Sequence, residues 1–582
     1  MFQLLINGEA VDLSPNSSIS IDEESPIFNQ DDIPGGFSFP FELPTTPKNN
    51  RILGFAGRVQ SRSQGGKDSP FQLFNNGRYI GSGTATVQKA TDLAYSAFLQ
   101  VSTGSFAGKI TGKKMSDLNL GGVREWIFKP EFVYPKDDFA LFPIYNTDFL
   151  KGTEFDGSFV FRHYPLNHWI DGDWYQEEGI IFAVTPFPYL AYVIQRVFEN
   201  FNIQLEENIL ATDPDFKGLC IYNNHDSAKL TYVTTPVTKF GYDNTTGTWH
   251  TFTVNTRTIS RGLDTFNLVD HLPDMLISDF ILSIRNMFNL AFVVTPRGTV
   301  RIKKRQDLIA VGSPVSLADK YIGRPLVTVS TDVKGVYLRW THEGNDLLFS
   351  EGFKDIFDHS DLIFPSVPNI AALHALVPTA NEIRLVENWH QYFQFAPETV
   401  DGVTTYSWIL YSNDFQDMKI GTDPEEFTTQ ASTLPMIHYQ RIPEGCYIRC
   451  PQAQQQSSSI IRTDSLPCTL RLLFYRGMTE DSNGDLYPYG SSDAFDPDGN
   501  LWPGASLSLK WQGETGLYEQ LWKGYLEWWK TRKSVTWTIL DPSILDFMTI
   551  YEIESNHYIL KRRTLTIESQ GPVPGDCEFY LV

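Results

Sequence analysis

Cysteine is scarce in this chain of 582 residues, with five in all: Cys220, Cys446, Cys450, Cys468 and Cys577. An odd number of cysteines in a chain that we expect to be made in the cytoplasm predicts free thiols rather than a disulfide framework. A structural zinc site would need a closer pair than Cys446 and Cys450, and also a fourth ligand. We therefore expect no metal at these residues.

The familiar short motifs of enzymes are also missing. The sequence has no His-Glu-x-x-His zinc motif, no Walker-type phosphate loop, no Rossmann glycine run and no Gly-x-Ser-x-Gly nucleophile turn. Two acidic stretches, residues 481–486 and 496–501, begin like calcium loops but lack the required later Gly and Glu, so we expect turns there. The sequence therefore predicts a protein that is not an enzyme, with no catalytic residue and no cofactor.

Long apolar segments are absent as well. The longest, residues 179–194, is interrupted by Pro186 and Pro188 and falls short of the roughly 20 residues that a membrane-spanning helix needs. The first residues, MFQLLINGEAVDL, have neither the basic region nor the apolar region of a signal peptide. We therefore expect no membrane span and no secretion signal.

Basic residues are outnumbered: 47 lysines and arginines stand against 69 acidic residues, which gives a net charge of -22. A surface this acidic repels nucleic acid and anionic membranes, so we expect no specific nucleic-acid binding. The same charge suits a conduit through which DNA slides without sticking, although an acidic surface is also a common means of keeping a protein soluble.

Aromatic residues are plentiful, at 14% of the chain. Aromatic side chains favour strands and protein interfaces, and a chain of this length is too long for a single core. Together these features predict a β-rich α+β protein of several domains, with barrel-like or sandwich β-domains and a few amphipathic helices.

Turn signals and periodicity divide the chain into four predicted units. They are an N-terminal β-domain (1–125), an α+β domain with two helix-strand units (126–310), an irregular β-rich domain (311–470) and a C-terminal β-domain with one amphipathic helix (471–582). In the first unit, Asn-Gly pairs at residues 7–8 and 76–77 predict tight β-hairpins. In the third, NIAALHAL predicts a short helix.

Two helices are predicted in the second unit. In PFPYLAYVIQRVFENFNI, the apolar residues between Leu190 and Phe201 fall on one helical face. In SDFILSIRNMFN, Ser278 is the predicted N-cap and Phe280 begins the apolar stripe. A strand is expected after each helix: IQLEE after the first, and the hairpin LAFVVTPRGTVRIKK after the second.

The helix predicted in GLYEQLWKGYLEWWKTRK carries the strongest interface signal. Trp528 and Trp529 are adjacent, so their side chains point about 100° apart on a helix and cannot both face one core. At least one of them is expected to meet a second domain or a neighbouring subunit. The candidate interface residues are Trp528, Trp529, Trp522, Phe37 and Phe39.

The segment HWIDGDWYQEEG places carboxylates beside indoles, as sugar-binding and sugar-cleaving sites do. A solvated turn at Asp171-Gly172 is the simpler interpretation, because local clusters of acidic residues usually lie in exposed loops. We keep Trp169, Trp174, Asp171 and Asp173 as candidate glycan contacts.

Three segments together resemble one family. They are IPGGFSFPFELPTTPKNNRILGF, LISDFILSIRNMFNLAFVVTPRGTVRI and a C-terminal segment that begins with SLKWQGETGLYEQLWKGYLEWWKTRKSVTWTIL and ends with IESNHYILKR. These segments are similar to parts of large tail proteins of phages and prophages of Bacteroidetes-type bacteria. By architecture, those proteins look similar to the baseplate or tail hub proteins of long-tailed phages. The resemblance is spread over the full length of the chain.

The resemblance implies a virion structural protein of the phage tail, made in the host bacterial cytoplasm. It implies a baseplate or tail hub position at the distal end of the tail tube, where a trimer or hexamer ring adapts symmetry and forms part of the conduit for DNA ejection. The implied partners are other copies of the chain, tail tube or distal tail proteins, and the tape-measure protein.

Two alternatives to the hub stay open. One is a receptor-facing tail-tip protein that binds glycan through Trp169, Trp174 or Trp502. The other is a glycan depolymerase, which would need carboxylates among Asp171, Asp173, Glu177 and Glu178.

Overall fold

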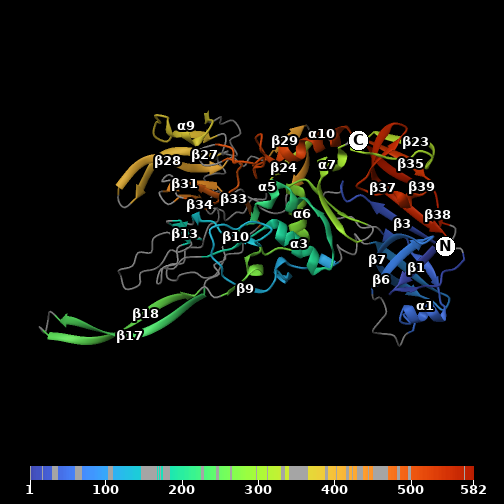
Figure 1. Cartoon of the computed structure of the whole chain (residues 1–582), viewed down its shortest axis with the longest axis horizontal. Helices are drawn as coiled ribbons and strands as arrows, with labels where there is room; N and C mark the ends of the chain where they lie inside the picture. The colour runs from blue at the N-terminus through green and yellow to red at the C-terminus, as the bar shows by residue number, and fades with distance from the viewer. Residues whose placement is uncertain are drawn as a thin grey trace.

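The computed structural model shows an elongated protein, with both termini at one end, a helical middle and further sheets beyond it (Figure 1). It is β-rich with few helices, which confirms the predicted fold class. The described residues are 2–15, 17–28, 37–58, 68–101, 109–145, 167, 169–170, 172–174, 184–223, 229–243, 248–262, 265–295, 298–310, 312–329, 335–339, 365–386, 391–400, 403–413, 418–421, 424–428, 437–442, 445–449, 470–480, 486–495, 500–568 and 571–582.

A long sheet joins the two ends of the chain. Its N-terminal strands are β1 (Phe2–Ile6), β2 (Glu9–Ala10), β3 (Ser18–Glu24), β4 (Phe37–Ser38), β5 (Phe41–Pro44), β6 (Ser69–Asn75), β7 (Arg78–Ala90) and β8 (Ala94–Val101). Its later strands are β22 (Val315–Ser316), β23 (Tyr321–Val329), β35 (Lys533–Ile539), β36 (Ile550–Ile553), β37 (Asn556–Glu568), β38 (Gly571–Pro572) and β39 (Gly575–Leu581). The main path runs β2-β1-β6-β7-β8-β4-β3-β37-β39-β35-β23.

The junction between the two halves of this sheet is the antiparallel pair of β3 and β37, which begins with Ser18 opposite Glu568. A salt bridge of 2.6 Å between Arg563 and Glu23 crosses the same junction. The core packed against the N-terminal strands also includes Ile567 of β37. The first and last predicted units therefore share a sheet and a core, and the four-unit division remains a prediction.

Both Asn-Gly hairpins are confirmed. Asn7 and Gly8 link β1 to β2 with φ of 55° and 79°, and Asn76 and Gly77 link β6 to β7 with φ of 48° and 78°. Positive φ at both central residues is the signature of the type I′ turn, whose twist matches that of the flanking strands. Asn and Gly adopt this conformation at the lowest steric cost.

The helices of the described residues are short. They are α1 (Pro47–Ile52), α3 (Leu190–Asn200), α4 (Ile209–Thr212), α5 (Pro214–Lys217), α6 (Ile277–Met287), α7 (Arg305–Ile309), α9 (Ile370–His374) and α10 (Lys523–Thr531). The short helix expected in NIAALHAL is α9, and it is capped by Asn369, whose side chain accepts a hydrogen bond from the Ala372 N–H.

The helices α3 and α6 confirm the two helices predicted in the second unit. Each is followed by a strand, and the strands meet in one sheet of order β15-β21-β20, with β15 (Leu205–Asn208), β20 (Leu290–Val294) and β21 (Val300–Lys304). One prediction was wrong: the N-cap of α6 is Leu276, without a side-chain bond, and Ser278 lies inside the first turn. Ile277 is fully buried, and its apolar packing favours a helix whose N-cap lies two residues earlier than predicted.

The helix predicted in GLYEQLWKGYLEWWKTRK is split into two parts. Residues Tyr518–Trp522 form a π-helical turn, and α10 continues from Lys523 to Thr531. The wider turn was not visible in the sequence, because apolar periodicity alone does not distinguish a π turn from an α turn. Trp522, in the π turn, is 1% exposed and donates its indole N–H to the Met287 carbonyl of α6 at 3.2 Å.

The remaining sheets are small. Their strands are β9 (Val123–Glu125), β10 (Phe139–Ala140), β11 (Ile144–Tyr145), β12 (Trp169–Ile170), β13 (Asp173–Trp174), β14 (Phe187–Pro188), β16 (Leu219–Ile221), β17 (Lys229–Asp243), β18 (Thr248–Gly262), β19 (Thr265–Asn267), β24 (Gly335–Arg339), β25 (Ser366–Val367), β26 (Ile383–Val386), β27 (Gln391–Val400), β28 (Val403–Asn413), β29 (Met418–Gly421), β30 (Pro424–Thr428), β31 (Ile437–Ile442), β32 (Gly445–Arg449), β33 (Leu472–Glu480) and β34 (Leu486–Ser491). The hairpin β17–β18 projects away from the body (Figure 1).

Candidate functional site

The predicted interface tryptophans lie where α10 packs against the end of the long sheet. Trp529 is 6% exposed, and Trp528, half-buried, donates its indole N–H to the Leu581 carbonyl at 2.9 Å. Both indoles contact Phe28 and Tyr580, with ring centroids 5.8–6.1 Å apart. The two adjacent rings therefore meet one aromatic cluster, supplied by distant parts of the same chain.

Trp522 and Trp529 thus lie inside this chain rather than on an exposed face. The helix packs on Phe28 from the N-terminal segment and on Tyr580 from β39. Both adjacent indoles, Trp528 and Trp529, therefore face one core, which the adjacency argument had excluded. The Arg532 guanidinium stacks 3.5 Å from the centre of the Trp529 ring. Such a contact holds the end of α10 against the sheet.

The phenylalanines of the first quoted segment divide between the core and the surface. Phe41 is 7% exposed and belongs to the core of the N-terminal strands, whereas Phe39 is 58% exposed. The backbone of Phe37 pairs with Asp22 of β3 and Gln100 of β8. Among the predicted interface residues whose exposure is described, Phe39 therefore has the most exposed side chain.

The candidate glycan contacts Trp169 and Trp174 are buried, at 3% and 5% exposed. Their indole N–H groups donate to the carbonyls of Leu486 and Lys129, at 2.9 and 2.8 Å. The two rings meet edge to face at 4.8 Å. Flat, exposed rings on which a sugar could stack are therefore not formed by this pair.

The carboxylates of the same segment are only partly described. Asp173 is exposed, and its Oδ1 accepts a hydrogen bond from the Trp174 N–H at 2.7 Å, which is an ordinary turn contact. Asp171, Glu177 and Glu178 lie outside the described residues, as do residues 481–485 and 496–499 of the acidic turns.

Metal and thiol chemistry have little support in the described ranges. No group of three or more His, Cys, Asp or Glu residues there could hold a metal ion. Cys220 and Cys577 are free and buried, and burial raises the pKa of the Cys577 thiol to about 12. A thiol with so high a pKa stays protonated and unreactive near neutral pH. Within the described part of the chain, none of the helices has the length and apolar character needed to cross a membrane.

A buried charge network, which the sequence analysis missed, ties three elements together. Arg476 on β33 lies 3.7 Å from Asp215 of α5 and donates to the carbonyls of Asp493 and Leu507 at 2.7 and 2.9 Å. Lys510 pairs with Asp493 at 2.5 Å, and both side chains are less than 10% exposed. Burial lowers the pKa of Arg476 to about 10. Because each charge faces an opposite charge, the network has a structural role.

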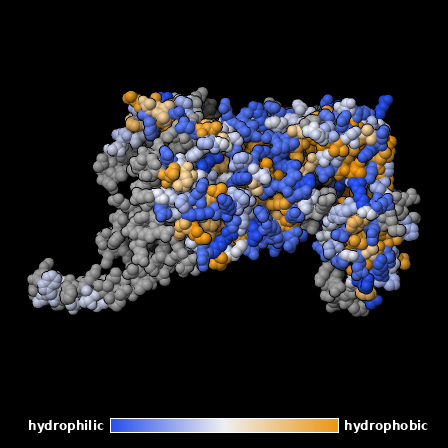
Figure 2. Space-filling model, in the orientation of Figure 1, coloured by the Kyte–Doolittle hydropathy of each residue, from blue (hydrophilic) through white to orange (hydrophobic). Residues whose placement is uncertain are grey.

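One end of the long sheet exposes apolar side chains. In β23, which pairs with β35 alone among the described strands, Ile322, Leu326 and Val327 are 48%, 68% and 53% exposed. Hydrophobic residues gather at this end of the molecule in Figure 2. Pro325 lies in the irregular part of β23. It is the sequence signal that could have identified β23 as an edge strand, because proline within sheets is confined to edges and bulges.

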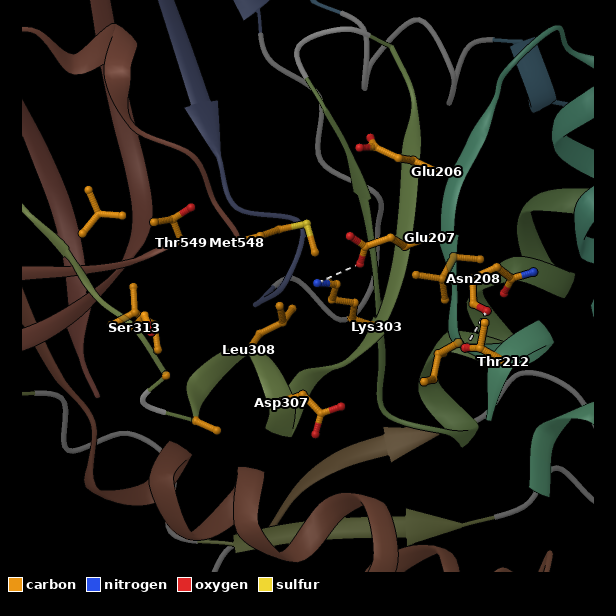
Figure 3. A pocket seen from close by; sticks show the side chains of 16 residues that line it. Glu206, Glu207, Asn208, Thr212, Lys303, Asp307, Leu308, Ser313, Met548 and Thr549 are labelled. Atoms are coloured by element: carbon orange, nitrogen blue, oxygen red, sulfur yellow. Dashed lines mark hydrogen bonds and ion pairs between the residues drawn. The ribbon is translucent and has the colours of Figure 1, made fainter. Parts of the chain in front are cut away.

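A pocket of about 760 Å³ lies between the helical middle and the long sheet (Figure 3). It is lined by β15, β21 and α7 on one side and by residues 548–550, which lead into β36, on the other. Lys303 and Glu207 form an ion pair of 2.8 Å at its wall, and burial raises the pKa of Asp307. No residue proposed from the sequence lines it. Its walls come from separate parts of the fold, so it marks the joint between them.

Comparisons with known proteins add a distant likeness. No model of a known protein family matches the chain, and no curated protein sequence matches it. Solved structures to which it is similar include the 43 kDa tail protein of prophage MuSo2 from Shewanella oneidensis, with 7% identity, a TM-score of 0.32, and coverage of 100% of this chain and 97% of that one. Another is a tail protein from Neisseria meningitidis MC58, with 8% identity, a TM-score of 0.31, and coverage of 100% and 95%. Scores this low show neither a common fold nor a common function.

Proposed function

We propose that this chain is a structural protein of the phage tail, placed in the baseplate or tail hub, where several copies form a ring around the conduit for DNA ejection. The observation that carries the proposal is the long sheet, whose path begins at the short β2 and ends at the exposed β23.

The two ends of this sheet are different surfaces. A contact between the β23 end of one copy and the opposite end of the next copy is head-to-tail, and such contacts close into a ring when the rotation between copies allows it. The sheet has an N-terminal and a C-terminal half joined at β3 and β37. Three copies with two halves each would present a pseudo-sixfold ring, as a protein between a sixfold tube and a threefold tip requires.

Physical chemistry favours a covered β23. An unpaired edge strand invites pairing with another chain, and folded proteins usually protect such edges with charge or a covering element. Leu326 and Val327 are neighbours in the strand, so they point to opposite faces and expose apolar surface on both sides. A neighbouring copy would remove both from water, a stabilisation of about 1.5–3 kcal/mol for each fully buried side chain.

The charge of the chain is compatible with this role. With a net charge of -22, a ring of several copies would repel the DNA that passes through it. Tail tube or distal tail proteins and the tape-measure protein are the partners proposed for the two openings of the ring.

The proposal is tested with the double variant Leu326→Lys and Val327→Lys. Mass photometry and negative-stain electron microscopy should show rings for the unchanged protein, and a tenfold to hundredfold weaker assembly for the variant. Val377→Lys is the control, because Val377 is 98% exposed and lies outside the long sheet, in the loop after α9. A protein that stays monomeric at every concentration, and that immunogold labelling does not find on tails, would contradict the proposal.

A further inference from the structure

The hairpin β17–β18 is a long two-stranded arm. Its two strands pair in an unbroken antiparallel register, from Lys229 opposite Gly262 to Asp243 opposite Thr248. Fifteen residues per strand correspond to a length of about 50 Å. Among the described strands none adds a third member to this sheet, and the arm projects from the body in Figure 1.

A ribbon of this kind needs a partner surface. An isolated two-stranded hairpin is only marginally stable in water, and a third strand or a packed face normally supports it. The described body of the same chain is not positioned to supply that face, because the arm points away from it (Figure 1). In the described part of the chain, no further strand therefore supports the arm, and another molecule can provide that support.

One face of the arm has the composition of an interface. The register places Tyr232, Phe240, Tyr242 and Trp249 at positions of the same face, because residues directly opposite each other in an antiparallel pair share a face and alternate residues do so along a strand. The four residues of this face whose exposure is described are all exposed: Thr238, Trp249, Thr251 and Thr253. Trp249 is 69% exposed, a large apolar area to leave in water.

The charge of the arm is opposite to that of the rest of the chain. Residues 229–262 contain four basic side chains, at Lys229, Lys239, Arg257 and Arg261, and one acidic side chain, at Asp243, for a net charge of +3. The remaining residues, with 43 basic and 68 acidic side chains, carry a net charge of -25. An aromatic and arginine-containing surface of positive sign fits an acidic protein surface.

We infer that the β17–β18 arm binds the acidic body of a second copy of this chain through the face that contains Trp249. Each copy then reaches across its neighbour, and the arm obtains the support and charge neutralisation that its own body does not give it. A nucleic acid is the less favoured occupant, because the large acidic remainder of the chain repels a polyanion. This inference specifies one contact between copies in the proposed ring. It rests on the proposed function only because it requires that copies of the chain associate.

A photo-crosslinking experiment tests the arm directly. Trp249 is replaced by p-benzoylphenylalanine, and a 1:1 mixture of unlabelled and ¹⁵N-labelled full-length protein is irradiated and analysed by peptide mass spectrometry. The control carries the same amino acid at Thr248, which is also exposed but lies on the opposite face. The expected result is crosslinks between labelled and unlabelled chains at position 249, at least fivefold more abundant than at position 248.

Several results would overturn the inference. Crosslinks confined to one chain, equal yields at the two positions, or transfer of the crosslink to DNA when duplex DNA is added would each do so. Assembled rings without crosslinks between copies at position 249 would refute the arm contact and leave the proposed ring intact. Absence of assembly in the unchanged protein would remove both.

A second variant checks the charge argument without a probe in the arm. Arg257→Glu with Arg261→Glu should weaken self-association at least tenfold in 0.1 M salt, and by less at 0.5 M salt, because salt screens the attraction in the unchanged protein. The matched control is Arg78→Glu, a half-exposed arginine on β7 far from the arm in sequence. Equal effects of the two changes would contradict a role for the arm charges.

Discussion

Replacing Lys510 by methionine should destabilise the protein strongly, because it removes the ammonium that pairs with a buried carboxylate. The Lys510 ammonium lies 2.5 Å from Asp493 Oδ2, and the two side chains are 9% and 4% exposed. Asp493 would keep its other hydrogen bonds, among them those from the Ala494 N–H and the Ser508 hydroxyl, both at 2.8 Å. These hydrogen bonds offset part of the cost.

The expected loss is about 3–5 kcal/mol in the free energy of unfolding, the usual cost of removing one partner from a buried ion pair. Urea-induced unfolding, followed by tryptophan fluorescence, measures it, since Trp511 lies next to Lys510 in the chain. Lys523→Met is the control: it removes a lysine from an exposed pair with Glu519, and little change is expected.

A double variant makes the reasoning refutable. Adding Asp493→Asn to Lys510→Met also removes the carboxylate that lost this partner, so the double variant should recover part of the stability that the single variant loses. Two results would show that the pair is not coupled as the distances indicate. One is a Lys510→Met variant as stable as the unchanged protein. The other is a double variant that is less stable than Lys510→Met by the full cost of Asp493→Asn measured alone.

Two further predictions concern buried aromatic residues. Trp529→Ala should lower the free energy of unfolding by about 3–5 kcal/mol, because a nearly buried indole is removed from a packed cluster. Trp249→Ala, at an exposed position, should leave the free energy of unfolding of the dilute monomer unchanged, and similar losses in both variants would contradict the cluster. Burial raises the pKa of Tyr525 and of Tyr551 to about 12, above the ordinary value near 10, so the folded protein keeps these protons longer than the unfolded chain and its stability should fall as pH rises from about 10 to 12. Absorbance at 295 nm in an alkaline titration should then show several tyrosines, these two among them, ionising only near pH 12 or above, or on unfolding. Ionisation of every tyrosine near pH 10 in the folded protein would refute the burial.

Local features of the sequence predicted local structure well. The Asn-Gly turns at 7–8 and 76–77 and the apolar stripes of α3 and α6 depend on neighbouring residues only, through backbone sterics and helical periodicity. The helix cap at Ser278 was wrong although it is also local, because packing of Ile277 into the core outweighed a side-chain bond of modest energy. Local rules hold where no tertiary contact competes with them.

The candidate sites were much less predictable. The sequence places Trp169 and Trp174 beside acidic residues. Their indole N–H groups, however, donate to the carbonyls of Leu486 and Lys129, which lie far from them in the sequence. The adjacency argument held that Trp528 and Trp529 cannot both face one core, whereas both indoles pack against Phe28 and Tyr580 of the same chain.

The sequence by itself determined the β-rich class, the hairpin turns, the helix faces and the acidic charge, because composition and short-range periodicity encode them. Only the tertiary structure decided that β3 pairs with β37, that the ion pair of Lys510 and Asp493 is buried, that β23 exposes apolar side chains, and that the β17–β18 arm projects from the body. These outcomes depend on which distant segments meet. Neither strand pairing between residues hundreds of positions apart nor the burial of a charge pair leaves a periodic trace in one sequence, since many other partners would satisfy the same local pattern equally well.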